Sequence, residues 1–292
     1  MTPATLGLAI AAPGRATRYN SIRRWAMSGI DDALAIVNSF EAAPRQGVWT
    51  NIDPARAIKG LRERVKDPSK IDQGGSLLCG PAAFAHDLAT DNPVAYVKAV
   101  INLYTGGTAV IGTLLLRPKT DLIFNPFSGG VDAVDWILLS SLRDSSNWFF
   151  DVEDVDGMLS AATLPSTMVT WLQRVGYTKV VNETNLWFVK DFANLKKANE
   201  LKENNYRVFL FVNSNIMKAK KRTSESLAPD HWVMLESPIE FSDPPALSLK
   251  TVSCVLYSWG RNESVPDSAK NEPPFMLSAF LRNYYGFVAC KH

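Results

Sequence analysis

The chain has 292 residues, of which 46% are hydrophobic and 21% are charged, so its composition is that of a globular protein with a sizeable buried core. Its 31 basic and 29 acidic residues leave a formal net charge of +2, which argues against nucleic acid as the main partner. No segment reaches the about 18 apolar residues that a membrane span needs. The short apolar run at 6–12 has no basic residue before it, so it is not predicted to be a cleaved signal peptide, and we expect a cytoplasmic location in the producing cell.

The first 50 residues are predicted to form an N-terminal extension of a domain that spans 51–292. Residues 1 to about 30 contain prolines, glycines and a basic pair at 23–24, and they indicate a loosely structured lead-in. The acidic pair at 31–32 caps a helical pattern over 33–43. Asp53 followed by Pro54 then opens a second helix, to about residue 65, because a capping residue with proline at the first helical position is a common helix start.

The stretch from Gln73 to Phe84 places a thiol where a glycine-rich loop becomes an alanine-rich helix, predicted over 79–89. Unpaired backbone N–H groups and the helix macrodipole favour an anion at a helix start, so we predict that Cys79 is a nucleophile with a lowered pKa. Gln73 lies across a Gly-Gly turn, where its amide is placed to bind an oxyanion. The other cysteines, Cys254 and Cys290, are predicted to be buried thiols rather than a disulfide.

A nucleophilic cysteine needs a base, and the chain has three histidines. His86 lies on the same predicted helix as Cys79 but about 10 Å along its axis, which is too far for a hydrogen bond. His292 ends the sequence and is expected to fray. His231 opens the apolar run 231–235, which reads as a strand that holds the imidazole at its edge. By elimination, His231 is the predicted base.

The remaining pattern divides the domain into a helical part, about 51–176, and a sheet part, about 177–292. Helices are predicted at 92–103, 131–143 and 166–176, with an apolar segment at 110–116. The acidic run at 151–157 does not fit a calcium loop, because the best register begins at Val152 and has Thr163 at position twelve. From residue 177 the period changes to two, and we predict strands at 178–189, 206–212, 231–235 and 249–257. Helices are expected at 191–204 and, rich in aromatic residues, at 275–287.

Three short islands of this sequence together resemble the papain-like cysteine hydrolases. The shared pattern is a Gln, five residues, then Cys-Gly-x-x-x-Phe at a helix start, followed far downstream by a strand histidine and a Ser-Trp-Gly. The Cys-Gly-Pro-Ala-Ala form is also similar to bacterial papain-fold peptidases and secreted effectors. In this chain the islands are Gln73 with residues 79–84, His231, and Ser258-Trp259-Gly260. The resemblance implies an α+β fold in which a helical lobe carries the nucleophile and an antiparallel sheet lobe carries the histidine, with the site in the cleft between them.

The residue that orients His231 remains open. Papain-like enzymes have an asparagine directly before the Ser-Trp-Gly, whereas this chain has Tyr257. Tyr257 or Ser258 through its hydroxyl, Asn262 or Asp243 from a loop, or a backbone carbonyl are the alternatives. The resemblance also implies that Trp259 shields the orienting hydrogen bond from water.

The resemblance implies acyl transfer, with Cys79 as nucleophile, His231 as base and Gln73 as oxyanion donor. We therefore expect a cysteine hydrolase, a peptidase or amidase without cofactor or metal, that acts on a peptide or peptidoglycan-type amide. A bacterial secreted effector or toxin, exported without a Sec signal, is the expected context, with a secretion-system partner or a cognate inhibitor. The alternatives are a glutamine deamidase or transglutaminase, a catalytically silent protein-binding module, and an unrelated α+β domain in which Cys79 and His231 lie far apart.

Overall fold

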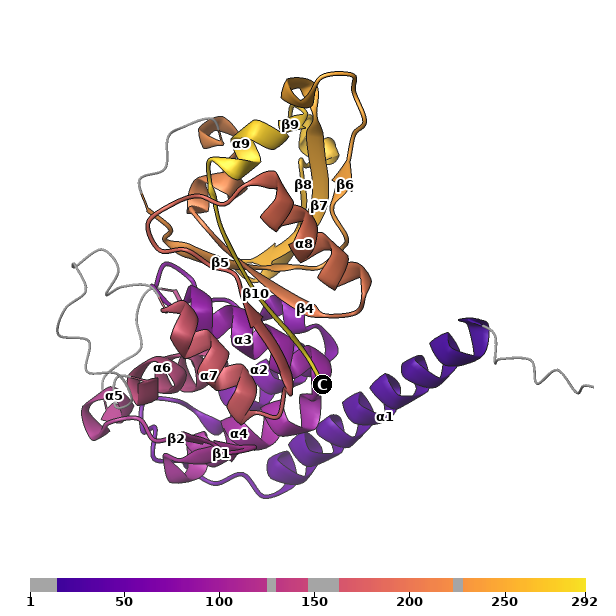
Figure 1. Ribbon diagram of the computed structural model, residues 1–292. Helices are drawn as coiled ribbons and strands as arrows, with labels where there is room; N and C mark the ends of the chain where they lie inside the picture. Colours follow the sequence, from indigo (N-terminus) through magenta and orange to yellow (C-terminus); the bar gives the residue numbers. More distant parts are fainter. Residues whose placement is uncertain (1–14, 125–129, 147–162, 223–227) are drawn as a thin grey trace, which may run out of the picture.

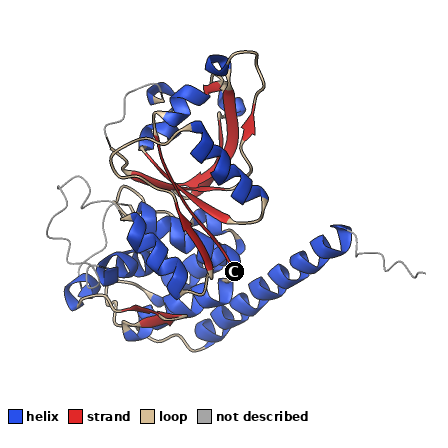
Figure 2. Ribbon diagram, in the orientation of Figure 1, coloured by secondary structure: helices blue, strands red, loops and turns tan. Residues whose placement is uncertain are grey.

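The computed structural model describes residues 15–124, 130–146, 163–222 and 228–292. Within these ranges the chain forms a helical half and a sheet half (Figure 1). The helical half contains a small β-hairpin, and the sheet half carries two helices on its outer face (Figure 2). The predicted α+β class with an antiparallel sheet is confirmed.

Within the described ranges the helical half has seven α-helices. They are α1 (Arg15–Ala42), α2 (Pro54–Lys66), α3 (Cys79–Asp91), α4 (Pro93–Gly106), α5 (Thr120–Phe124), α6 (Ala133–Ser146) and α7 (Pro165–Arg174), with the hairpin of β1 (Ala109–Ile111) and β2 (Leu114–Leu116) between α4 and α5. Of these helices, α2, α4, α6 and α7 pack against α3.

Local capping chemistry sets several helix starts where the sequence predicts them. The side chain of Asp53 accepts a hydrogen bond from the amide of Ala55, directly before Pro54 at the start of α2. Asn92 caps α4 in the same way, and Gly107 ends that helix in the left-handed conformation. In contrast, α1 begins at Arg15 rather than near residue 33, because its 28 residues contain no proline to interrupt it.

All strands of the large sheet pair antiparallel, in the order β3-β10-β4-β5-β7-β6, and β8 and β9 also pair with β7. The strands are β3 (Lys179–Asn182), β4 (Arg207–Val212), β5 (His231–Leu235), β6 (Glu240–Phe241), β7 (Thr251–Ser258), β8 (Arg261–Val265), β9 (Phe275–Met276) and β10 (Tyr284–Lys291), accompanied by helices α8 (Phe192–Glu203) and α9 (Leu277–Leu281).

The sheet is covered on both faces, so it is the middle layer of the molecule. Phe209 and Phe211 of β4 pack with the helices of the helical half. The alternate residues Val208 and Leu210 pack on the other side with α8 and α9. The helical half therefore packs directly against one face of the sheet.

The predicted aromatic-rich helix at 275–287 is wrong. This segment forms β9, the short α9 and the first residues of β10. β10 lies between β3 and β4, and seven of its eight residues are buried, so its sequence lacks the alternation that marks a half-exposed strand. Gly286 within it has φ +108°, and a Cβ there would lie 2.2 Å from the carbonyl oxygen of Glu183.

Two further expectations differ from the structure. The strand predicted at 178–189 is only β3, because the side chain of Asn185 accepts hydrogen bonds from the amides of Trp187 and Phe188 and turns the chain out of the sheet. His292 does not fray: its Nε2 lies 2.7 Å from Asp91 Oδ2 and its ring stacks on Tyr177.

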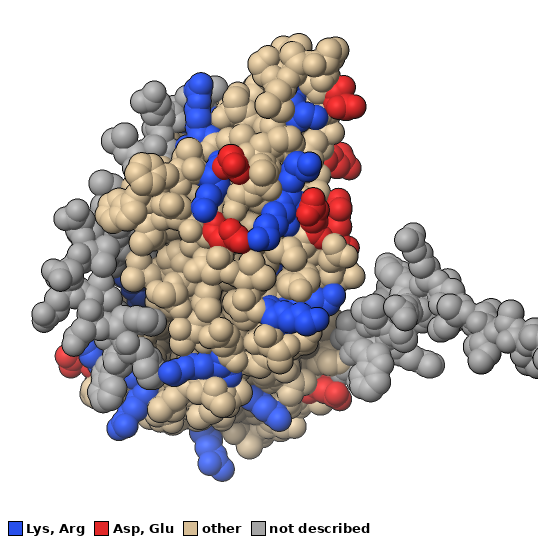
Figure 3. Space-filling view, viewed as in Figure 1, with Lys and Arg blue, Asp and Glu red and all other residues tan. Residues whose placement is uncertain are grey.

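The charge distribution on the surface and the character of the helices are relevant to nucleic-acid and membrane partners. Figure 3 shows basic and acidic side chains interspersed over the sheet half, with uncharged surface between them. None of the helices in the described ranges combines the length and the apolar character needed to cross a bilayer.

Candidate active site

Cys79 is the first residue of α3 and lies against the chain on both sides of His231. Its Sγ is 3.9 Å from the carbonyl oxygen of Asp230, and the backbone amide of Trp232 hydrogen-bonds to the thiol. Only 4% of Cys79 is exposed. The structure thus brings the predicted nucleophile to the start of the strand that carries the predicted base.

Burial has the largest effect on the pKa of the Cys79 thiol. It raises the pKa of Cys79 to about 11, and the nearby Asp230 carboxylate adds to the increase. Hydrogen bonds from the amides of Trp232 and Gly80 oppose this change but do not outweigh it. The prediction of a lowered thiol pKa is therefore wrong: the helix start supplies the expected N–H groups, but the thiol is withdrawn from water.

His231 is the first residue of β5, and its ring is held from two directions. Its Nε2 lies 2.6 Å from Ser258 Oγ, and its imidazole stacks on the indole of Trp259 with ring centroids 4.2 Å apart. His231 is 3% exposed, and burial, assisted by the positive charge of Lys218, lowers its pKa to about 3. The imidazole is therefore neutral over the physiological range.

The turn that carries Trp259 is strained. Trp259 and Gly260 join β7 to β8, and both have positive φ, +47° and +73°. Such a two-residue turn normally takes Asn-Gly or Gly-Gly, because a bulky residue is disfavoured in the left-handed region. The stacking of Trp259 on His231 supplies a reason for keeping a tryptophan there.

Of the four residues considered as the orienter of His231, Ser258 is the one whose side chain contacts the ring. The hydroxyl of Tyr257 instead donates to the carbonyl oxygen of Ile71. The carboxylate of Asp243 is fully exposed and lies 3.6 Å from the Lys250 ammonium. Asn262 is exposed on β8, opposite Tyr257.

Gln73 lies in the loop directly before α3 and is 6% exposed. Its Nε2 donates one hydrogen bond, 2.9 Å long, to the carbonyl oxygen of Ser76, and the hydroxyl of Ser76 donates back to the carbonyl oxygen of Gln73. The amide is thus fixed within its own loop, and Nε2 carries a second hydrogen.

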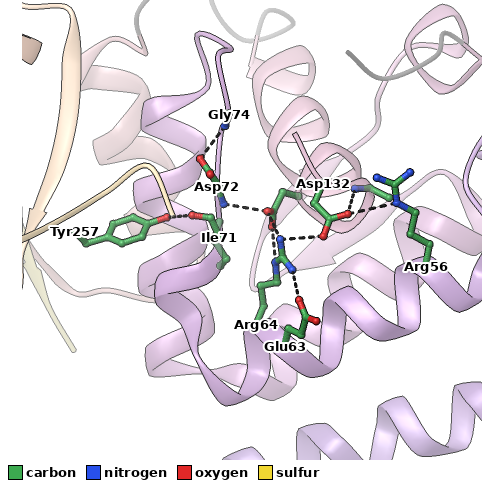
Figure 4. Close-up of polar contacts among 10 residues, drawn as sticks. Arg56, Glu63, Arg64, Ile71, Asp72, Gly74, Asp132 and Tyr257 are labelled. Carbon is green, nitrogen blue, oxygen red and sulfur yellow. Dashed lines mark hydrogen bonds and ion pairs between the residues drawn. The ribbon is translucent and has the colours of Figure 1, made fainter. Parts of the chain in front are cut away.

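A buried ion pair between two distant helices supports this loop (Figure 4). Arg64 of α2 holds the carboxylate of Asp135 in α6 through Nη2 to Oδ2 at 2.8 Å and Nε to Oδ1 at 3.2 Å. Asp135 also accepts from the amide of Asp72, and Asp72 accepts from the amide of Gly74. Burial raises the pKa of Asp135 to about 6, against the opposing effect of Arg64. The paired residues are 71 positions apart, so no local pattern reveals them.

The described residues contain no group of three or more His, Cys, Asp or Glu side chains arranged to hold a metal ion. All three cysteines are free and buried. No protein-family model, no curated protein and no solved structure matches the chain.

Proposed function

We propose that this chain is a cysteine hydrolase that cleaves an amide bond by acyl transfer, with a papain-like arrangement of nucleophile and base. The observation that carries the proposal is the contact of the Cys79 thiol with the backbone flanking His231, whose ring is held by Ser258 and Trp259. An activated cysteine nucleophile consists of a thiol, an imidazole that takes its proton, and a third group that orients the imidazole, here a hydroxyl.

The protonation states favour a general-base mechanism. At rest the thiol donates to the carbonyl oxygen of Asp230. With Nε2 facing Ser258, we assign the imidazole proton to Nε2, which leaves Nδ1 unprotonated as the base. As Sγ adds to the substrate carbonyl carbon, the thiol proton passes to Nδ1, and the imidazolium that forms is stabilised by Ser258. Because the thiol and imidazole are neutral at rest, this proton moves only as the bond to sulfur forms.

The rest of the cycle uses the same groups. The Cys79 amide and the Gln73 side chain bind the tetrahedral oxyanion. The imidazolium then protonates the leaving amine as the C–N bond breaks, which leaves a thioester on Cys79. A water molecule, deprotonated by His231, attacks the thioester and releases the acid, and the thiol regains its proton.

We infer the substrate and biological context from the resemblance to papain-like enzymes alone. The substrate is a protein or a peptide-containing molecule, including peptidoglycan-type amides, and the context is that of a bacterial secreted effector or toxin. Deamidation of glutamine and transglutamination use the same acyl-enzyme with a different leaving group or acceptor, so they are variants of this proposal.

A silent protein-binding module is the competing function. The observation that favours it is the deep burial of both groups, with 4% of Cys79 and 3% of His231 exposed and both neutral. The two proposals differ in whether Cys79 forms a covalent acyl adduct.

The test is acylation by p-nitrophenyl acetate, followed by the burst of p-nitrophenolate and by intact mass. The proposal predicts one acetyl group on Cys79, removable by hydroxylamine, with a burst that is lost in Cys79→Ala and strongly slowed in His231→Asn. Cys254→Ala is the matched control, because it removes another buried thiol and leaves the burst intact. A wild-type protein that acquires no acetyl group, or acquires it at the same rate as His231→Asn, supports the binding module instead.

A further inference from the structure

The end of β7 contacts both the base and the loop that carries the oxyanion donor. Ser258 faces His231, whereas the preceding residue, Tyr257, faces the helical half of the molecule, since successive strand residues point to opposite faces. The Tyr257 hydroxyl donates to the carbonyl oxygen of Ile71, two residues before Gln73 (Figure 4). Two neighbouring residues of one strand thus reach two parts of the candidate site.

The ring of Tyr257 is clamped in place. It is 2% exposed and stacks on the imidazole of His86, with ring centroids 3.7 Å apart and an interplanar angle of 10°. His86 belongs to α3, the helix that begins at Cys79, and its Nε2 lies 3.0 Å from Glu236 Oε1 beyond the end of β5. The hydroxyl of Tyr257 is therefore fixed relative to both the nucleophile helix and the strand of the base.

The loop is held at three points next to Gln73. The carbonyl oxygen of Ile71 accepts from Tyr257, and the amide of Asp72 donates to Asp135, which Arg64 anchors. The turn after β7 also lies close against the loop, because a Cβ added to Gly260 would lie 2.9 Å from the Cβ of Asp72. One of these points comes from the ion pair between α2 and α6, one from Tyr257 in β7, and one from the turn that follows β7.

We propose that Tyr257 is a positioning residue that sets the oxyanion-binding loop relative to His231. This inference rests on the proposed function, in which Gln73 binds the oxyanion. Oxyanion donors act only when they lie within hydrogen-bond distance of the developing charge, so a small displacement of the loop weakens them. Through Tyr257 and Ser258, the end of β7 fixes the donor and the base as one unit.

The experiment compares two reactions of Cys79 in the same variants. Acylation by p-nitrophenyl acetate passes through a tetrahedral oxyanion, whereas alkylation by iodoacetamide displaces iodide without one. Tyr257→Phe removes the hydroxyl and keeps the ring that stacks on His86. Tyr96→Phe is the matched control, because Tyr96 is also buried and its hydroxyl has no hydrogen-bond partner among the described residues.

We expect Tyr257→Phe to slow acylation at least about tenfold, a part of the roughly 10²- to 10³-fold effect of losing an oxyanion donor. Alkylation and its pH profile should stay within twofold of wild type, and Tyr96→Phe should change neither reaction. The double variant Tyr257→Phe with Gln73→Ala should be no slower in acylation than Gln73→Ala alone, because the two residues act through one group. Effects that multiply, or an equal loss in both reactions, would overturn the inference.

Hydrogen exchange of the peptide covering 72–78 separates this inference from the proposed function. The amides of Gly74 and Ser76 are hydrogen-bonded within the loop, so they report its order without any turnover. Tyr257→Phe should speed their exchange at least tenfold, and Tyr96→Phe should not. Unchanged exchange overturns the positioning role even if wild type is active, whereas faster exchange in a protein that never acylates refutes only the hydrolase.

Discussion

The buried, neutral state of His231 predicts how the stability of the protein depends on pH. A histidine binds a proton near pH 6.5 in the unfolded chain but near pH 3 in the folded one. Between these values the unfolded state binds more protons, so the free energy of unfolding falls as the pH falls. From pH 6.5 to pH 4 this one residue removes about 3 kcal/mol of stability, by integration over the two pKa values.

His231→Asn isolates this contribution because asparagine does not titrate. Urea unfolding of wild type and variant at pH 6.5, 5 and 4 gives the free energy of unfolding of each. The difference between the two proteins should change by about 3 kcal/mol over that range. Asp87 and Asp135, whose pKa values burial raises, and Glu236, whose pKa is lowered, affect both proteins alike and cancel in the difference.

Two results would refute this reasoning. One is a pH dependence that is the same in wild type and His231→Asn within about 1 kcal/mol, since that would mean that His231 titrates alike in the folded and unfolded states. The other comes from NMR of the wild-type imidazole, which should show a neutral ring protonated at Nε2 down to pH 4.5. A ring that titrates near pH 6.5 in the folded protein contradicts the burial argument.

Three further predictions concern the same site. Ser258→Ala leaves the buried Nε2 of His231 without its hydrogen-bond partner, at a cost of about 1–3 kcal/mol, so burst kinetics should show acylation slowed at least about fivefold. A full-rate burst would exclude Ser258 as the orienter. Trp259→Ala opens the imidazole to water, so the pKa of His231 should rise toward 6.5 in an NMR titration, and no rise would mean that the indole does not shield it. Cys79 should react slowly with iodoacetamide at pH 7, where a pKa of about 11 leaves a thiolate fraction of about 10⁻⁴, and faster as the pH approaches 11. Rapid labelling below pH 8 would argue for a thiolate.

Features governed by neighbouring residues were predictable from the sequence. Asp53-Pro54 and Asn92-Pro93 open α2 and α4, because each cap is built from adjacent groups. The start of α3 at Cys79 follows from the glycine loop before it. The short apolar runs at 206–212 and 231–235 likewise predicted β4 and β5, although both strands are buried along nearly their whole length.

Features governed by distant packing were not predictable. β10 is buried on both faces, so its sequence carries no alternation, and the pairing of Arg64 with Asp135 depends on how α2 and α6 meet. The prediction of a lowered pKa for Cys79 was wrong for the same reason. The helix start is a local feature, but the burial that raises the pKa depends on the whole fold. The residue that orients His231 could not be chosen from the sequence, because Tyr257 and Ser258 are adjacent in β7 and point to opposite faces. Only the register of β7 shows which of them faces the imidazole.

The place of β10 in the sheet has a consequence for how the chain folds. It is the last in sequence of the strands that the structure describes, yet it lies between β3 and β4. During synthesis from the N-terminus, the edges of β3 and β4 that pair with β10 therefore stay unpaired until residues 284–291 have been made. Unpaired strand edges can pair with other chains. A nascent or truncated chain that lacks β10 should thus be prone to aggregation, although it already contains Cys79, His231 and Ser258.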